Sequence, residues 1–145
     1  MTRGVKVTVT ERGGRQFAST GSAWEPVIGY SRAVRVGDSI QVTGTVGVEQ
    51  DGQFAKTMKG QAKRALEIII ATIEALGGTA ADVVRTRIYV TDISKWEEVG
   101  QAHGELFGQI RPATTIVQVA RLIDDQALVE IEAEAVLSPE ELDIM

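Results

Sequence analysis

The chain contains no cysteine, which excludes disulfide bonds, thiolate metal sites and a cysteine nucleophile. Its single histidine, His103, cannot form a metal site without distant carboxylates, so we expect no metal. Prolines number only three and long polar tracts are missing, which favours a globular fold over disorder. No apolar run approaches the roughly 18 residues of a membrane span, and the N-terminal segment lacks the apolar region of a signal peptide. We therefore expect a cytoplasmic protein with no membrane partner.

Basic residues are also in the minority, because 15 Lys and Arg face 20 Asp and Glu and give a net charge of −5. An acidic protein repels phosphate backbones, so nucleic acid is not an expected partner. The 145 residues, 43% of them hydrophobic, suffice for one buried core. We expect a single domain over residues 1–145.

The hydrophobic pattern predicts both strands and helices. Apolar and polar residues alternate, or β-branched residues dominate, in six segments that we expect to be strands: 5–11, 30–36, 39–45, 82–92, 111–122 and 129–136. Residues 15–26 are predicted to be a loop. Apolar spacings of three and four predict helices over 57–76, with Thr57 as N-cap, and after a capping box at 94–97. The order predicts an α+β two-layer sandwich, a mixed six-stranded sheet with two helices on one face.

The last predicted strand carries the main candidates for chemistry. Strict alternation places Glu130, Glu132 and Glu134 on one face and small apolar residues on the other. Neighbouring carboxylates repel, so they need water, cations or a ligand, and a solvated outer face explains them equally well. Repulsion raises the pKa of a carboxyl, as a general base requires, but the pattern does not select one of the three. His103 lies on the apolar stripe of a predicted helix, where we expect it to pack.

Several segments resemble the RidA/YjgF family, whose small trimeric proteins include enamine and imine deaminases. Residues 29–34 resemble the family's Gly-Pro-Tyr-Ser-Gln-Ala-Val without its proline, and residues 82–92 are similar to Asp-Val-Val-Lys-Thr-x-Val-Tyr-Leu-x-Asp. Residues 111–136 resemble the C-terminal signature. The resemblance implies a chorismate mutase-like fold and a homotrimer with clefts between subunits. We expect the open sheet face, carrying Ile116 and Gln118, to pack in that trimer.

The resemblance also implies a site. It assigns Glu130 to the hydrolytic water and Tyr30 to the pocket wall, with backbone near Gly44 lining the pocket, although a β-bulge explains Gly44 equally well. In deaminating members an arginine grips the substrate carboxylate, and here that position is Thr114. A hydroxyl makes one hydrogen bond to a carboxylate, which is weaker than the two bonds that a guanidinium makes. The other expected ligand-binding residues are Thr115, Ile116 and Arg111, the last as a substitute cation.

Two functional classes remain open. In the first, water oriented by Glu130 attacks the C=N carbon of a small imine or related electrophile other than the usual 2-imino acids, without any cofactor. In the second, a non-catalytic trimer binds a small uncharged or weakly polar metabolite. Some relatives are labelled ribonucleases, an activity that the acidic charge disfavours.

Overall fold

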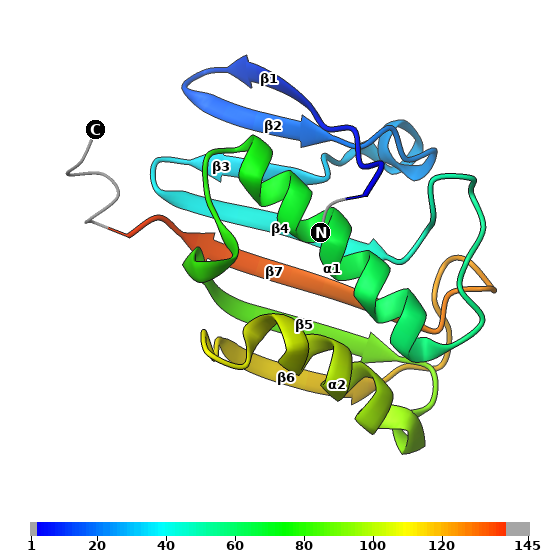
Figure 1. Ribbon diagram of the computed structural model, residues 1–145. Coiled ribbons are helices and arrows are strands. Elements are labelled where there is room, and N and C mark those ends of the chain that lie inside the picture. The colour runs from blue at the N-terminus through cyan, green and yellow to red at the C-terminus, as the bar shows by residue number, and fades with distance from the viewer. Residues whose placement is uncertain (1–2, 139–145) are drawn as a thin grey trace.

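The computed structural model describes residues 3–138, which form a two-layer α+β sandwich (Figure 1). A seven-stranded sheet runs in the order β1-β2-β3-β4-β7-β5-β6. Neighbouring strands are antiparallel except β5 and β6, so the sheet is mixed. The strands are β1 Thr8–Arg12, β2 Arg15–Ser19, β3 Ala33–Val36, β4 Ser39–Val46, β5 Val83–Val90, β6 Ala113–Gln118 and β7 Val129–Val136.

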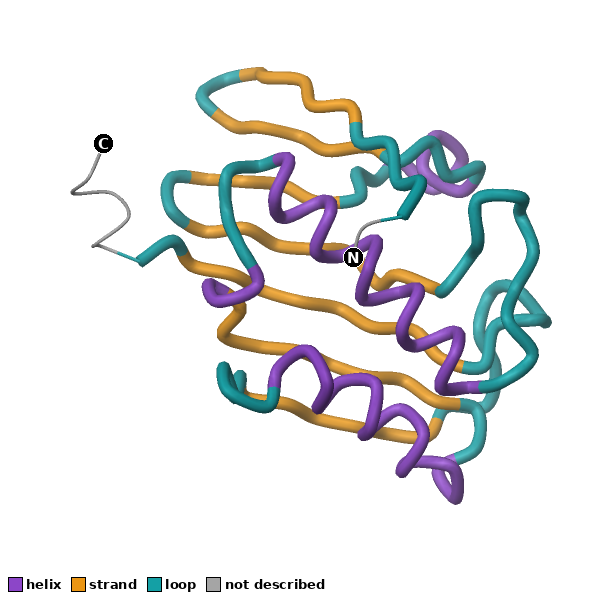
Figure 2. Tube along the Cα trace, in the orientation of Figure 1, coloured by secondary structure: helices purple, strands orange, loops and turns teal. Residues whose placement is uncertain are grey.

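Both long helices, α1 Met58–Ala75 and α2 Trp96–Phe107, lie on one face of the sheet (Figures 1 and 2). Short helical turns precede β3, β5 and α2: η1 Glu25–Gly29, η2 Ala80–Asp82 and η3 Ile93–Lys95. The α+β class and the placement of the helices are as predicted. None of the helices within residues 3–138 is long and apolar enough to cross a membrane.

The sheet has seven strands rather than six because β2 occupies part of the predicted 15–26 loop. It pairs with β1 on one side and β3 on the other, and its Ala18 is fully buried. Only one of its five residues is buried, so the segment shows no apolar alternation. Pairing with two neighbours, which a local pattern does not report, makes it a strand.

The helix starts are partly as predicted. The Thr57 hydroxyl accepts a hydrogen bond from the Gly60 N–H at 3.0 Å, which confirms Thr57 as the N-cap of α1. The predicted capping box at 94–97 is wrong. Asp92 accepts bonds from the Ser94 N–H at 3.0 Å and the Ser94 hydroxyl at 2.6 Å, so Ser94 acts as a donor in the turn η3.

The core lies between the helices and the covered sheet face, with Ile69, Ile88 and Ile131 at most 1% exposed. Ile116 pairs with Ile88 in the parallel register and packs against this core. The Gln118 side chain lies on the same face and accepts a hydrogen bond from the Ile93 N–H at 2.9 Å. The prediction that Ile116 and Gln118 lie on the open face is therefore wrong. The register of β6 decides the face, and the sequence left it undetermined.

Candidate active site

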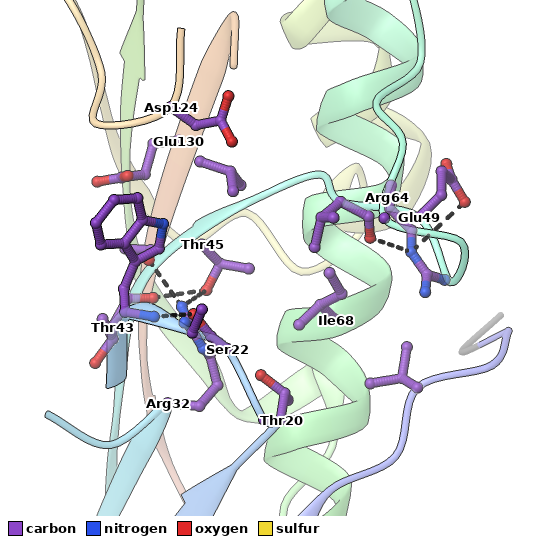
Figure 3. A pocket seen from close by; sticks show the side chains of 18 of the residues that line it. Thr20, Ser22, Arg32, Thr43, Thr45, Glu49, Arg64, Ile68, Asp124 and Glu130 are labelled. Carbon is purple, nitrogen blue, oxygen red and sulfur yellow. Dashed lines mark hydrogen bonds and ion pairs between the residues drawn. The ribbon is translucent and has the colours of Figure 1, made fainter. Parts of the chain in front are cut away.

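A cleft of about 880 Å³ opens where β4 meets the N-terminal segment, η1 and α1. Figure 3 shows Arg32, Thr45 and Glu130 on the strand side of the cleft and Ile68 and Arg64 on the α1 side. Its rim includes exposed apolar side chains, which we call the apolar rim: Trp24, Ile28 and Ile123. A concave site with an apolar rim and a few polar groups is typical of small-molecule binding.

Gly44 lies in an irregular stretch of β4, where the pairing with β7 shifts register between Val42 and Thr45. A Cβ built on Gly44 would lie 2.5 Å from Oε2 and 2.9 Å from Cδ of Glu130. The missing side chain thus lets the Glu130 carboxylate lie directly against the β4 backbone.

Glu130 projects from β7 on the face away from the helices, since its neighbours Val129 and Ile131 are fully buried on the other. Its carboxylate is partly buried and accepts no hydrogen bond from the described residues 3–138. Burial raises the pKa of the Glu130 carboxyl, the negative charge of Glu132 raises it further, and the positive charge of Arg32 lowers it. A carboxylate with a raised pKa and free lone pairs is a candidate general base.

The two other glutamates of β7 are already engaged. Glu132 accepts a hydrogen bond from the Tyr89 hydroxyl at 2.8 Å, and this bond raises the pKa of Tyr89. Glu134 pairs with Arg87 at 2.9 Å. Of the three carboxylates that the sequence left equivalent, Glu130 is the one that lines the cleft.

Arg32 is the residue of this site that the sequence analysis missed. It immediately precedes β3, is 6% exposed and lines the cleft. Its Nη1 donates to the Gly44 carbonyl at 2.9 Å and to the Thr45 hydroxyl at 3.2 Å. Glu25 of η1, itself 7% exposed, lies 3.9 Å from Nη2. One signal in the sequence could have identified it. Arg32 is a charged residue within the predicted strand 30–36, and a charged side chain that becomes buried in a sheet requires partners.

Tyr30 stands beside this ion pair. Its hydroxyl accepts from Arg32 Nη2 at 3.4 Å, and its ring centroid lies 5.5 Å from the Arg32 guanidinium carbon. The cleft therefore brings together Tyr30, Gly44 and Glu130 from the predicted site residues.

The predicted site residues of β6 lie elsewhere in the chain. Thr114 Oγ1 is 2.7 Å from Thr86 Oγ1 and 3.4 Å from His103 Nε2. The His103 ring packs on Phe107, with centroids 4.7 Å apart, and burial lowers its pKa, so the imidazole is neutral at neutral pH. These contacts place Thr114 on the helix-covered face, away from Glu130.

Thr115 and Arg111 also lie apart from the cleft. The Thr115 hydroxyl accepts from Arg85 Nη2 at 2.7 Å. Arg111 takes a left-handed backbone with φ of 57°, and its Nε donates to the Gly108 carbonyl at 3.2 Å. Within one chain neither Arg111 nor the β6 residues reach the cleft that Glu130 lines.

The chain has extensive similarity to known proteins. The family model described as Endoribonuclease L-PSP matches residues 20–137. The chain belongs to the RidA/YjgF family. A RutC family protein from Pyrococcus abyssi is 36% identical over 123 residues, which are 83% of this chain and 96% of that relative.

Two further RidA/YjgF relatives bear on the fold and the chemistry. The crystal structure of Rv2704 from Mycobacterium tuberculosis, a member of the YjgF/YER057c/UK114 family, matches with a TM-score of 0.79 and 48% identity, covering 85% of this chain and 99% of that one. A protein from Dermatophagoides farinae named 2-iminobutanoate/2-iminopropanoate deaminase is 30% identical over 125 residues, 85% of this chain and 97% of the relative.

The RidA/YjgF residues named from the sequence thus divide into two groups in one chain. Tyr30, Gly44 and Glu130 share the cleft, whereas the β6 group lies on the opposite side of the β7–β5 pair. The β6 group consists of Thr114, Thr115 and Ile116. β6 is an edge strand of the sheet, so one of its sides has no strand neighbour among residues 3–138.

Proposed function

We propose that this RidA/YjgF protein is a homotrimer that binds a small metabolite in clefts between its subunits and hydrolyses a reactive enamine, imine or related electrophile there. The observation that carries the proposal is the Glu130 carboxylate, which lines the cleft without a hydrogen-bond partner in residues 3–138 and has a raised pKa. A raised pKa makes a carboxylate a stronger base toward a bound water.

In the proposed reaction, water lies between Glu130 and the C=N carbon of the bound imine. Its oxygen forms a bond to that carbon while one of its protons passes to Glu130, and the C=N electron pair moves to nitrogen, which takes that proton from Glu130. The resulting carbinolamine then loses its hydroxyl proton to Glu130. The C=O double bond forms as the C–N bond breaks, and the nitrogen takes the proton from Glu130 and leaves as ammonia, which restores the carboxylate.

Assembly as a trimer would join the two groups of site residues. The sheet face away from the helices carries Glu130, Glu132 and Glu134, and neither α1 nor α2 covers it. Packing of these faces around a threefold axis, as the family resemblance implies, would set β6 of one copy beside the cleft of the next. Thr114 and Thr115 would then border the cleft from the neighbouring subunit.

The residue at position 114 limits the substrates. The resemblance implies an arginine here in deaminases of 2-imino acids, and Thr114 offers one hydroxyl that already bonds to Thr86. We therefore expect 2-iminopropionate to be hydrolysed poorly. A substrate without a carboxylate does not need that anchor.

The test measures mass and hydrolysis together. Light scattering should give the mass of three chains, and Glu130→Ala should lose ammonia release from enamine and imine substrates while keeping that mass. Glu134→Ala on the same strand is the matched control, and it should retain hydrolysis. A mass of one chain would refute the trimer, and equal rates for Glu130→Ala and the unmodified protein would place the chemistry elsewhere.

A further inference from the structure

The Arg32 guanidinium is buried but has unused donors. Nη1 has two acceptors within 3.2 Å, whereas Nη2 reaches only the Tyr30 hydroxyl at 3.4 Å and Glu25 at 3.9 Å. Nε is buried and has no hydrogen-bond partner among residues 3–138. An unpaired buried N–H is costly, so it calls for an acceptor that the described chain does not supply. The unpaired Nε and the Nη2 with its long contacts form one edge of the guanidinium, which suits a planar acceptor.

The Glu130 carboxylate in the same cleft has no hydrogen-bond donor, just as Arg32 Nε has no acceptor, among residues 3–138. The carboxylate is partly buried and faces Gly44. Arg32 donates through Nη1 to the carbonyl of that same Gly44, and both side chains line the cleft. The cleft therefore offers both a donor and an acceptor to a bound molecule.

The charges around Arg32 argue against an anionic occupant. Glu25 lies 3.9 Å from Nη2, and Arg32 is close enough to Glu130 to act on its ionisation. A bound carboxylate would be a third negative group around one guanidinium, and like charges at such distances repel. A neutral polar group satisfies the same donor edge without that repulsion.

We propose that Arg32 and Glu130 together bind a neutral amide-like group, whose carbonyl oxygen accepts from Arg32 and whose N–H donates to Glu130. The proposal rests on the cleft of the proposed function and specifies the class of ligand it takes. The rest of the ligand is apolar and packs on the apolar rim of Trp24, Ile28 and Ile123, which are 43%, 56% and 63% exposed in the chain. Benzamide, with a planar amide on an apolar ring, is a probe of this class.

The experiment titrates the full-length protein with benzamide and with benzoate, which has the same shape but a carboxylate in place of the amide. Nitrogen-15 NMR follows the Nε–H signal of Arg32, assigned by its loss in Arg32→Gln. Benzamide should shift that signal, and benzoate should bind at least tenfold more weakly. Arg32→Gln should weaken benzamide binding about ten- to a hundredfold, as expected for loss of a hydrogen bond from a charged donor.

Two further variants keep the test interpretable. Arg12→Gln removes an arginine that stacks on Phe17 in the β1–β2 hairpin and does not line the cleft, so it should bind benzamide as the unmodified protein does. The double variant Glu25→Gln with Arg32→Gln leaves no buried charge unpaired and should fold while still binding weakly.

Each contrary result has a distinct meaning. Benzoate binding as tightly as benzamide, or undiminished benzamide binding by the double variant, would overturn the role of Arg32 and the ligand class while leaving hydrolysis at Glu130 intact. Binding of neither probe would also overturn the ligand class. Loss of hydrolysis in Glu130→Ala distinguishes that outcome from failure of the proposed function.

Discussion

Replacing Gly44 by alanine tests whether the β4 backbone positions Glu130. The added Cβ would lie 2.5 Å from Oε2 and 2.9 Å from Cδ of Glu130, whereas non-bonded contacts settle near about 3.5 Å. The carboxylate must therefore move by about 1 Å. It is the end of a flexible side chain, so it moves more readily than the surrounding backbone.

The structure predicts a small change in stability and a large change in activity. A strained side-chain rotamer costs about 0.5–1.5 kcal/mol. Gly44 is not among the glycines with positive φ, so alanine is compatible with its backbone and gains about 0.4–1 kcal/mol by restricting the unfolded chain. The free energy of unfolding should thus change by less than about 1 kcal/mol. A displacement of about 1 Å in a catalytic group can lower the rate about a hundredfold.

The assay compares kcat/KM for ammonia release with urea unfolding at one protein concentration, and benzamide binding gives a readout that does not depend on the substrate. Gly104→Ala in α2 is the control, because its Cβ meets nothing within 4 Å. It should gain about 0.5–1 kcal/mol of stability and keep full activity. Unchanged kcat/KM and benzamide affinity in Gly44→Ala would refute the role given to this contact.

Three other outcomes follow from single positions. A Cβ on Gly47 would collide with the backbone carbonyl of Gln61, which cannot move aside as a side chain can. Gly47→Ala should therefore lower the free energy of unfolding, measured with urea, by about 1–3 kcal/mol. Unchanged stability would contradict this packing. Thr57→Ala should cost about 1 kcal/mol and Thr57→Ser much less, also by urea unfolding, since the hydroxyl caps α1. The raised pKa of Glu130 means that its protonated form favours the fold below the ordinary value of 4.5 and that this contribution is lost as pH rises through the raised pKa. Glu130→Gln should therefore gain stability relative to the unmodified protein as the pH rises above 4.5, and a pH-independent difference would show that Glu130 is not buried as described.

Local sequence patterns predicted the elements whose burial follows a regular period. The α1 stripe and the alternation of β7 each report one buried face, so both elements lie where the pattern placed them. β2 escaped prediction because pairing on both sides, not apolar alternation, holds it in the sheet. Ile116 was placed on the wrong face because a shift of one residue in register reverses every side chain of a strand.

The candidate site was less accessible to sequence reasoning than the fold. Family resemblance selected Glu130, and the structure adds a physical distinction, since Glu132 and Glu134 have partners and Glu130 has none within residues 3–138. Arg32 could not be assigned from local pattern. Its burial depends on Glu25, which a separate turn brings to it, and on the Gly44 carbonyl of another strand.

Two independent features of the chain bear on the charge of the ligand that we propose for the cleft. At position 114 the resemblance implies a guanidinium, and the chain has a hydroxyl that bonds to Thr86. At position 32 the chain has a guanidinium, but the buried Glu25 already pairs with its charge, and its Nε has no hydrogen-bond partner among residues 3–138. A carboxylate therefore meets no unpaired positive charge at either position, whereas a neutral acceptor is held by hydrogen bonds alone. Both positions favour an uncharged ligand, and the comparison of benzamide with benzoate measures that preference at the cleft.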